Sequence, residues 1–301
     1  MAACESDIIT ESTHMFMSMD ERARLEAEYT PSYLLLADYD FHCSSIDYSA
    51  SDHRGRHTIF YLLRLWSVDI VDRFLSIPSL KSMILQKDNF GFSPLHVALE
   101  TNQVQACFDL MREGNADLLE PDPHGDTALH HISRHHFSNP EALALMKTYL
   151  SLGGDINARN NLGDTPLLTY LATRNREPTG LSFYVENDAE LTAANYSGET
   201  AVHILAKIDT GLEKSLFGGG GGGGGGGGNG QDFKLFAKLV LRGCDPFRED
   251  FERRTALDIA ATVGNQGIVD LYQRKRDGIS WEEEAHEAEI HYFGSTGLFG
   301  A

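Results

Sequence analysis

Short apolar segments with helical spacing recur along the chain in pairs, and polar turns separate the pairs. The second member of a pair is clearest at Val104–Glu113, Ala142–Leu152 and Phe233–Arg242, where apolar residues return every three or four positions. No region is rich in segments with the alternating pattern of strands. The pattern therefore predicts an all-α protein built from short paired helices.

One motif precedes the helix pairs and returns in register along the chain. An Asp or Asn begins it, a Gly follows three residues later, and a Ser or Thr follows two residues after the Gly, as in Asp88–Ala98. Further copies are Asp122–His130, Asn160–Leu167, Asn195–Ala206 and Asp250–Ala261. Successive turn positions are 34, 38, 35 and 55 residues apart, counting from Gly91 to Arg253. A period in this range indicates a repeat architecture, in which each repeat buries the apolar face of the next.

The residue types of the motif have physical roles. Gly suits the left-handed turn, Ser or Thr caps the following helix, and Pro fits the first helical position. Leu95, Leu129, Leu167, Val202 and Leu257 are expected in the core, and Ala98, Ala206, Ala260 and Ala261 should let paired helices approach closely. The structural motif positions are Gly91, Ser93, Pro94, His96, Gly125, Thr127, His130, Gly163, Thr165, Pro166, Gly198, Thr200, His203 and Thr255.

The five copies resemble the ankyrin-repeat family over residues 52–275. The resemblance implies a solenoid of stacked helix-turn-helix repeats with β-hairpin-like loops, in which the motif His ties the hairpins together by hydrogen bonds. It divides the chain into an N-terminal extension (1–51), a degenerate cap (52–87) and repeats at 88–121, 122–159, 160–194, 195–249 and 250–275. A glycine-rich insertion at 211–231 should loop out as a disordered segment, and 276–301 should form an acidic helical tail.

Several segments depart from the motif. The segment at 52–63 is interpreted as a degenerate sixth copy or an N-terminal cap, in which Thr58 stands one place late. Arg253 replaces the turn glycine, which predicts a looser hairpin there. Pro178 is expected between the helices of its repeat, which predicts a short second helix at 181–186. A further helix is expected at Asp20–Glu28. The sequence leaves open whether the chain is a fragment of a longer protein.

The resemblance also implies the function, since ankyrin domains bind partner proteins through hairpin tips and the exposed side of the first helices. The corresponding positions are Asn89, Phe90, Phe92, Glu100, Thr101, His124, Asp126, Arg134, His135, Asn161, Leu162, Asp164, Tyr196 and Glu199. Phe90 and Phe92 are either interface anchors or pack on the preceding cap. Asp126, Asp164 and Glu199 share one motif position, so they form either an acidic row that binds a basic partner segment or a solvated row without a partner.

Composition narrows the classes of function. The formal net charge of −19 disfavours binding to nucleic acid or to an anionic membrane surface. Four scattered cysteines form neither a disulfide framework nor a zinc motif, which indicates an intracellular protein of the cytoplasm or nucleus. We expect a monomer that binds a protein, either as a scaffold or adaptor or as the regulatory ankyrin portion of a larger signalling protein.

The histidines at 130–136 offer the one candidate for metal chemistry. His131 and His135 stand four residues apart, the spacing of a zinc pair on a helix, but no third ligand is evident. The competing interpretation is an exposed polar helix end. No nucleophile motif or phosphate-binding glycine loop is present in the sequence, so we expect no enzyme activity, no cofactor and no metal, with the histidine cluster as a remote alternative.

Overall fold

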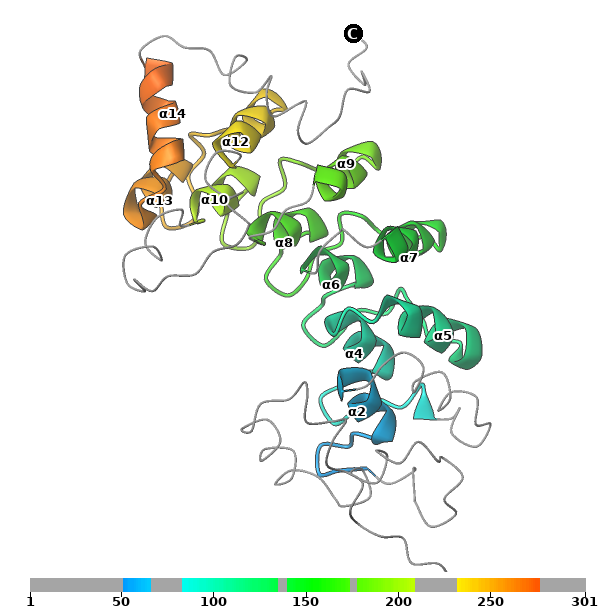
Figure 1. Cartoon of the computed structure of the whole chain (residues 1–301). Helices are drawn as coiled ribbons and strands as arrows, with labels where there is room; N and C mark the ends of the chain where they lie inside the picture. The colour runs from blue at the N-terminus through cyan, green and yellow to red at the C-terminus, as the bar shows by residue number, and fades with distance from the viewer. Residues whose placement is uncertain (1–50, 66–82, 135–139, 174–177, 209–231, 277–301) are drawn as a thin grey trace, which may run out of the picture. The chain divides into compact units, whose positions relative to one another are not determined.

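Helices make up almost all of the regular structure in the computed structural model, which describes residues 51–65, 83–134, 140–173, 178–208 and 232–276 (Figure 1). Within those ranges the strand-like pairings are two isolated bridges, Ser51 with His57 and Ala194 with Thr200. The predicted all-α class is therefore confirmed. The chain divides into two compact units, Met1–Leu118 and Leu119–Ala301.

In the first unit, α4 (Pro94–Glu100) packs against both of its described neighbours, α2 (Thr58–Leu65) and α5 (Val104–Gly114). Leu62, Ala98 and Leu110 are fully buried in this unit. The arrangement buries the apolar stripe of each helix against the next, as the sequence pattern predicts.

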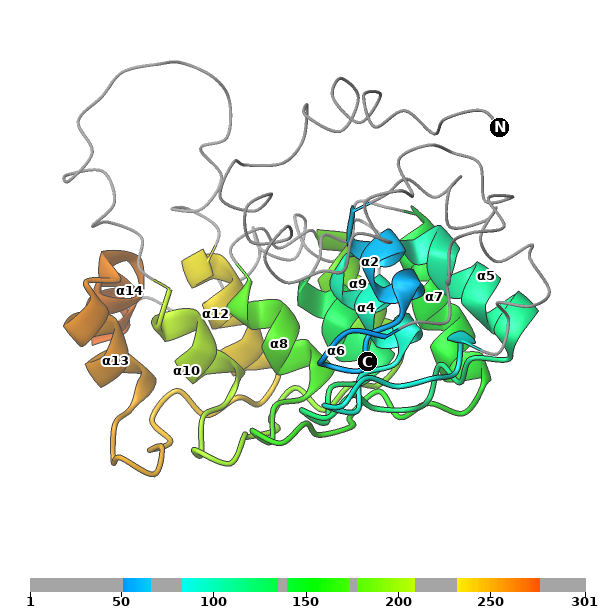
Figure 2. The same cartoon turned by 90° about the horizontal axis from the view of Figure 1, so that it is seen from below.

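The second unit contains two rows of helices. The first row is α6 (Ala128–Arg134), α8 (Pro166–Ala172), α10 (Ala201–Ala206) and α13 (Ala256–Val263), and each of these helices contacts the next. The second row is α7 (Pro140–Ser151), α9 (Pro178–Glu186), α12 (Asp232–Leu241) and α14 (Gln266–Arg276), and each packs on its partner in the first row. Figure 2 shows the turns before α8, α10 and α13 on one side of the first row.

The first helices begin at the residues that the motif predicts. The side chains of Ser93, Thr165 and Thr255 each accept a hydrogen bond from the backbone N–H three residues later. Pro94 and Pro166 then occupy the first helical position, where a missing N–H is harmless. The caps therefore fix where these short helices start.

The last described repeat differs from expectation in its burial. Leu95, Leu129, Leu167 and Val202 are buried as predicted, but Leu257 is only half-buried and Ala261 is exposed. The reason is that no helix pair follows α14 within the described residues, so nothing there covers this face.

The prediction for the second helix of the third repeat is wrong in its start. Helix α9 begins at Pro178 and runs to Glu186, because Pro stands at the first helical position and does not interrupt the helix. The predicted helix at 20–28, the insertion at 211–231 and the tail at 276–301 fall outside the described residues, apart from Arg276 at the end of α14. No helix in the described part of the chain is long and apolar enough to cross a membrane.

Candidate functional site

Six turns share one hydrogen-bond arrangement, and the side chain that begins each turn organises it. Oδ1 of this residue, which we call the turn Asx, accepts the backbone N–H groups two and four residues later at 2.8–3.0 Å. The turn Asx residues are Asp52, Asp88, Asp122, Asn160, Asn195 and Asp250. The degenerate segment after Asp52 therefore forms the same turn as the five clear copies.

The fourth residue of each turn adopts a left-handed backbone conformation. Gly163 has a φ of 78°, and the corresponding Arg253 has a φ of 60°. Arg253 N–H still donates to the carbonyl oxygen of Asp250 at 3.0 Å, the same bond that Gly163 makes to Asn160 at 2.8 Å. The prediction of a looser hairpin at Arg253 is wrong, because the other turn bonds hold this residue in the strained region.

Whether a turn Asx is Asp or Asn agrees with the group that faces its second side-chain atom. Where the neighbour is a hydrogen-bond donor, an Asp accepts from it: Oδ2 of Asp88 lies 3.1 Å from Nε of Arg56. Tyr61 hydroxyl donates to Oδ2 of Asp52 at 2.5 Å. Arg254 likewise donates to Oδ2 of Asp250 at 2.8 Å.

Where the neighbour is a carboxylate, the turn Asx is Asn. The side-chain amide of Asn160 donates to Oδ1 of Asp126 at 2.8 Å. The amide of Asn195 donates to Oδ1 of Asp164 at 2.9 Å. Each bond joins one turn to the turn of the preceding repeat, so these polar pairs help to hold consecutive repeats in register.

The acidic row predicted at Asp126, Asp164 and Glu199 is wrong as an exposed feature. Asp126 and Glu199 are 3% and 5% exposed, and Asp164 is half-buried. Besides the bond from Asn160, Asp126 forms an ion pair with Arg134. These acids are buried because they bond to residues that the fold brings beside them, and the residue types alone do not reveal those contacts. Whether the three acids bind a partner stays a prediction.

A groove lies over α8 and α10 of the second unit. Two adjoining pockets, of about 540 and 280 Å³, share Leu162, Asp164, Ala172 and Ile204 as lining residues. Leu162 comes from the turn before α8, Ala172 from the end of α8 and Ile204 from α10. The larger pocket is also lined by Glu199 and Lys207, and the smaller one by Arg134. A few charged side chains beside apolar ones are typical of a binding site.

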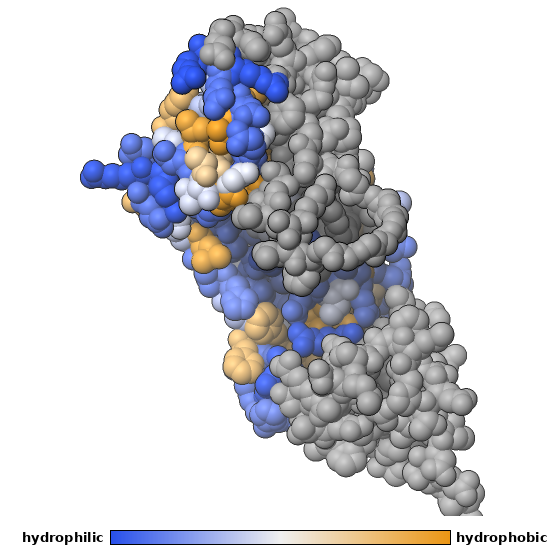
Figure 3. Space-filling model, turned by 60° about the vertical axis from the view of Figure 1, so that its left-hand side comes forward, coloured by the Kyte–Doolittle hydropathy of each residue, from blue (hydrophilic) through white to orange (hydrophobic). Residues whose placement is uncertain are grey.

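Exposed apolar residues stand at the turns beside the groove. Leu162 and Tyr196 are 68% and 62% exposed, as predicted for partner-binding positions, and Phe251 is 77% exposed at the same motif position as Tyr196. The Tyr196 and Phe251 rings approach so closely that a Cβ at Gly163 or Gly198 would meet them at 2.6 and 2.9 Å. Phe251 is not among the positions predicted from the sequence, although its motif position could have identified it. Figure 3 shows scattered hydrophobic residues, in orange, among mostly hydrophilic ones on one face.

The other predicted partner-binding positions are distributed as follows. Phe90 is 60% exposed, whereas Phe92 is half-buried with its ring nearly perpendicular to that of His96. Whether either ring anchors a partner stays a prediction. Glu100 is exposed and pairs with Arg64 at 3.1 Å. His135 falls outside the described residues. The remaining positions are Asn89, His124 and Asn161, which are exposed, and Thr101, which is half-buried.

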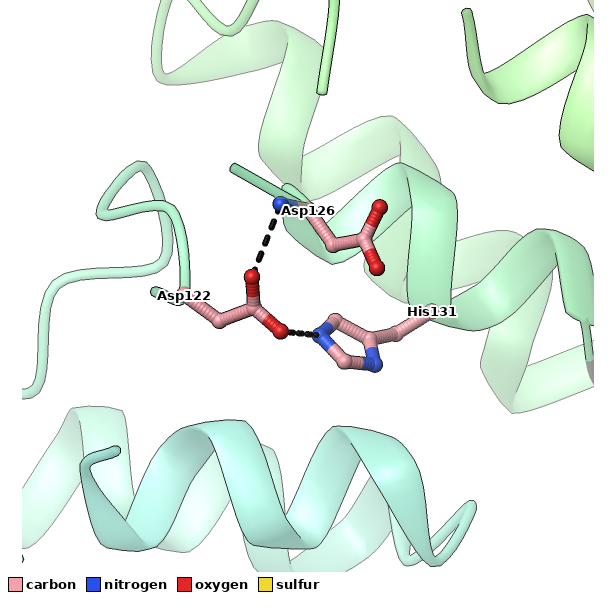
Figure 4. A group of neighbouring side chains, drawn as sticks. All are labelled: Asp122, Asp126 and His131. Atoms are coloured by element: carbon pink, nitrogen blue, oxygen red, sulfur yellow. Dashed lines mark hydrogen bonds and ion pairs between the residues drawn. The ribbon is translucent and has the colours of Figure 1, made fainter. Parts of the chain in front are cut away.

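Asp122, Asp126 and His131 form a buried cluster that the sequence did not predict (Figure 4). His131 is 5% exposed, so the interpretation as part of an exposed helix end is wrong for this residue. Its Nε2 lies 3.2 Å from Oδ2 of Asp122, an ion-pair distance, although the geometry is not that of a good hydrogen bond. Burial opposes ionisation of Asp122, but His131 and two backbone amides outweigh it and lower the pKa of this carboxyl.

The three side chains could supply one oxygen, one oxygen and one nitrogen to a metal ion, with these atoms within 4.8 Å of one another. The carboxylates are already in use, however. Oδ1 of Asp122 accepts two backbone N–H groups, and the two oxygens of Asp126 accept from Asn160 and Arg134. Hydrogen bonds within the chain therefore occupy Oδ1 of Asp122 and both oxygens of Asp126.

Comparisons with known proteins give distant similarity. No family model matches the chain. The chain is 22% identical over 304 residues to the nuclear factor NF-kappa-B p105 subunit of Gallus gallus, covering 88% of this chain and 28% of that protein. It is 24% identical over 241 residues to a probable serine/threonine-protein kinase of Dictyostelium discoideum, covering 79% of this chain and 26% of the kinase. The chain thus spans less than a third of either relative.

Proposed function

We propose that the chain is an ankyrin-repeat protein that binds a partner protein in the groove over α8 and α10. The observation that carries the proposal is the groove itself, which combines apolar walls at Leu162 and Ile204 with the carboxylate of Asp164. The repeated turns and paired helices support the ankyrin assignment. The similarity to p105, a protein that contains ankyrin repeats, also supports it.

The surface around the groove suits a protein partner better than a small molecule. Both pockets are open to solvent, and the exposed Leu162 and Tyr196 extend the apolar surface beyond them. An exposed Tyr beside a groove provides contact area that loses little conformational entropy on binding, which is typical of interface anchors.

A substitution that fills the groove tests the proposal. Ala172 is exposed at its floor, so Ala172→Trp should block a partner without disturbing the core. Ala144 is exposed on α7, in the second row of helices, and Ala144→Trp is the matched control. Proteins captured from a native lysate by the full chain are identified by mass spectrometry, and each is then tested against both variants.

We expect partners that bind the wild-type chain and A144W but are lost with A172W. Unfolding midpoints close to that of the wild type for both variants would show that the fold is intact. Equal capture by A172W and A144W would contradict the proposed function at this groove.

A second candidate is that the chain acts as the regulatory ankyrin portion of a larger signalling protein. The observation that favours it is that the chain corresponds to only 28% of p105. A transcript that continues the reading frame beyond residue 301 or before residue 1 would support this candidate, and a mature protein with the mass of the present chain would contradict it.

A further inference from the structure

The acidic residue after the turn glycine has a fixed cationic partner in two of the repeats. Asp126 pairs with Arg134 at 2.5 Å, and Glu199 pairs with Lys207. In both cases the cation stands eight residues after the acid and belongs to the same repeat. The two ion pairs neutralise carboxylates that are themselves almost fully buried.

The repeat between them has the acid without the cation. Eight residues after Asp164 stands Ala172, which replaces the long basic side chain by a methyl group. Oδ1 of Asp164 accepts from Asn195, and among the described residues Asp164 forms no ion pair. Asp164 and Ala172 line both pockets, so the missing side chain and the open groove coincide.

We propose that the groove binds a partner segment in which an Arg or Lys lies next to an apolar residue, with the basic side chain reaching Asp164. This inference rests on the proposed function and names the chemistry of the partner. The basic side chain takes the place that Arg134 and Lys207 take in the flanking repeats. The adjacent apolar residue lies on Leu162 and Ile204.

Charge complementarity selects this occupant. Arg134 and Lys207 also line the groove, but each is paired with a carboxylate of its own repeat. Asp164 lines both pockets and forms no ion pair among the described residues, so its carboxylate is the one left to a basic occupant. An ionised donor to a half-buried carboxylate forms a charge-assisted hydrogen bond, which is stronger than a neutral one. An acidic segment would instead place a second negative charge beside Asp164.

The test uses peptides selected from a random displayed library on the full chain. The tightest binder is synthesised with its basic residue and as a neutral analogue, with citrulline for Arg or acetyl-lysine for Lys. Affinities are measured by fluorescence anisotropy for the wild type, Asp164→Asn, Ala172→Arg, Ala172→Gln and Glu190→Gln. Asp164→Asn keeps the acceptor for Asn195, and Ala172→Gln matches Ala172→Arg in bulk without the charge. Glu190 is exposed outside the groove, so Glu190→Gln controls for net charge.

We expect Asp164→Asn to weaken the basic peptide about tenfold and to leave the neutral analogue nearly unchanged. Ala172→Arg should weaken the basic peptide more than Ala172→Gln does, because it supplies the missing cation from within the chain. Glu190→Gln should stay within about twofold of the wild type.

Three results would overturn the inference. The selected peptides could lack a basic residue, or the selection could yield no binder. Asp164→Asn could weaken both peptides equally. Binding could strengthen in a chain carrying Arg174→Gln and Arg176→Gln, which would assign the chain's own cations to Asp164. A lack of basic peptides, or an equal loss of both peptides with Asp164→Asn, leaves the proposed function intact if captured proteins still distinguish A172W from A144W. Equal capture by A172W and A144W counts against the proposed function itself.

Discussion

The choice between Asp and Asn at each turn follows from the chemistry of the atom that faces it. All six residues use Oδ1 in the same way, so the two types are interchangeable in that respect. The second atom differs: it must accept from Arg56 at Asp88, but it must donate to Asp126 at Asn160. A mismatch would leave two acceptors or two donors together in a buried place, which is costly. Five of the six turn residues are therefore matched to a hydrogen-bonding neighbour, the exception being Asp122.

This matching predicts the outcome of a swap between repeats. Asn160→Asp would put two carboxylates 2.8 Å apart and should lower the free energy of unfolding by about 2–3 kcal/mol. Adding Asp126→Asn should restore most of the loss. The new amide at position 126 can then donate to the new carboxylate at position 160, while the amide oxygen still accepts from Arg134. Urea denaturation of the two single variants and the double variant measures the coupling.

Effects that simply add in the double variant would contradict the matching, since they would show that residues 126 and 160 act independently. A control double variant combines Asn160→Asp with Asp258→Asn in α13. Asp258 caps its own helix and bonds to no other turn among the described residues, so it should show no coupling to residue 160.

Arg253 carries backbone strain that the other turns avoid with glycine. A left-handed conformation costs an L-residue about 1–2 kcal/mol, and a glycine at the same position avoids this cost. Part of the advantage is lost, because glycine has more conformational freedom in the unfolded chain. We expect Arg253→Gly to raise the free energy of unfolding by about 0.5–1 kcal/mol. Arg253→Ala removes the same side chain but keeps the strain, so it should give no such gain in the same urea titration. Equal stabilisation by both variants would attribute the effect to the arginine side chain instead.

At the scale of helices, the first-row elements are too short to be stable alone, since isolated helices below about 12 residues are marginal in water. Their caps and their bonds to the next repeat supply the missing stability. Backbone N–H of Thr127 and Thr200 donates to Nδ1 of His130 and His203 respectively. Nε2 of the same rings lies 2.9 Å from the carbonyl oxygen of Asp164 and 3.0 Å from that of Arg248. The neutral ring with its proton on Nε2 satisfies both contacts.

The bridging histidines predict how stability depends on pH. Burial lowers the pKa of His130 and His203 below 6.5, and their hydrogen bonds to backbone carbonyls only partly oppose it. The unfolded chain therefore binds protons that the folded chain does not. The contribution of each histidine is complete above pH 6.5 and is lost as the pH falls towards the folded pKa. Between pH 7 and 5 the slope is at most about 1.4 kcal/mol per pH unit for each histidine.

His203→Asn isolates the contribution of one ring. The variant should be less stable at pH 7 by about 1–2 kcal/mol, because the bridge to Arg248 is lost. Its unfolding midpoint should also fall less steeply than that of the wild type between pH 7 and 5. An unchanged slope would show that His203 does not take up the proton.

Helix starts could be predicted from the sequence because they depend on local chemistry. Thr165 and Pro166 fix the start of α8 through a cap and a preset backbone angle, and both act within one turn. Burial of Asp126 could not be predicted, since it depends on Asn160 and Arg134, which the fold brings together. The groove could not be predicted from the sequence either. The small side chain of Ala172 becomes informative only when α8 is compared with the neighbouring helices of its row.

For the whole molecule, net charge is a poor guide to the binding surface. The described residues carry only a small excess of Asp and Glu over Lys and Arg, so most of the net charge of −19 falls on the remaining segments. The expectation of a basic partner from the acidic row was therefore founded on residues that are mostly paired. A basic partner is proposed on a different ground, the carboxylate of Asp164 in the groove, which forms no ion pair among the described residues.

The glycine run at 218–228 separates α10 from α12, which nevertheless pack against each other. Stability of this repeat should depend on that packing and little on the length of the connection, since each doubling of a loop costs only about 0.6 kcal/mol. Deleting 218–228 should therefore change the free energy of unfolding by less than about 1 kcal/mol. Leu239→Ala, at a fully buried position of α12, should lower it by about 2–5 kcal/mol and shows that the urea titration detects damage to this repeat. A deletion as damaging as Leu239→Ala would mean that the glycines themselves take part in the packing.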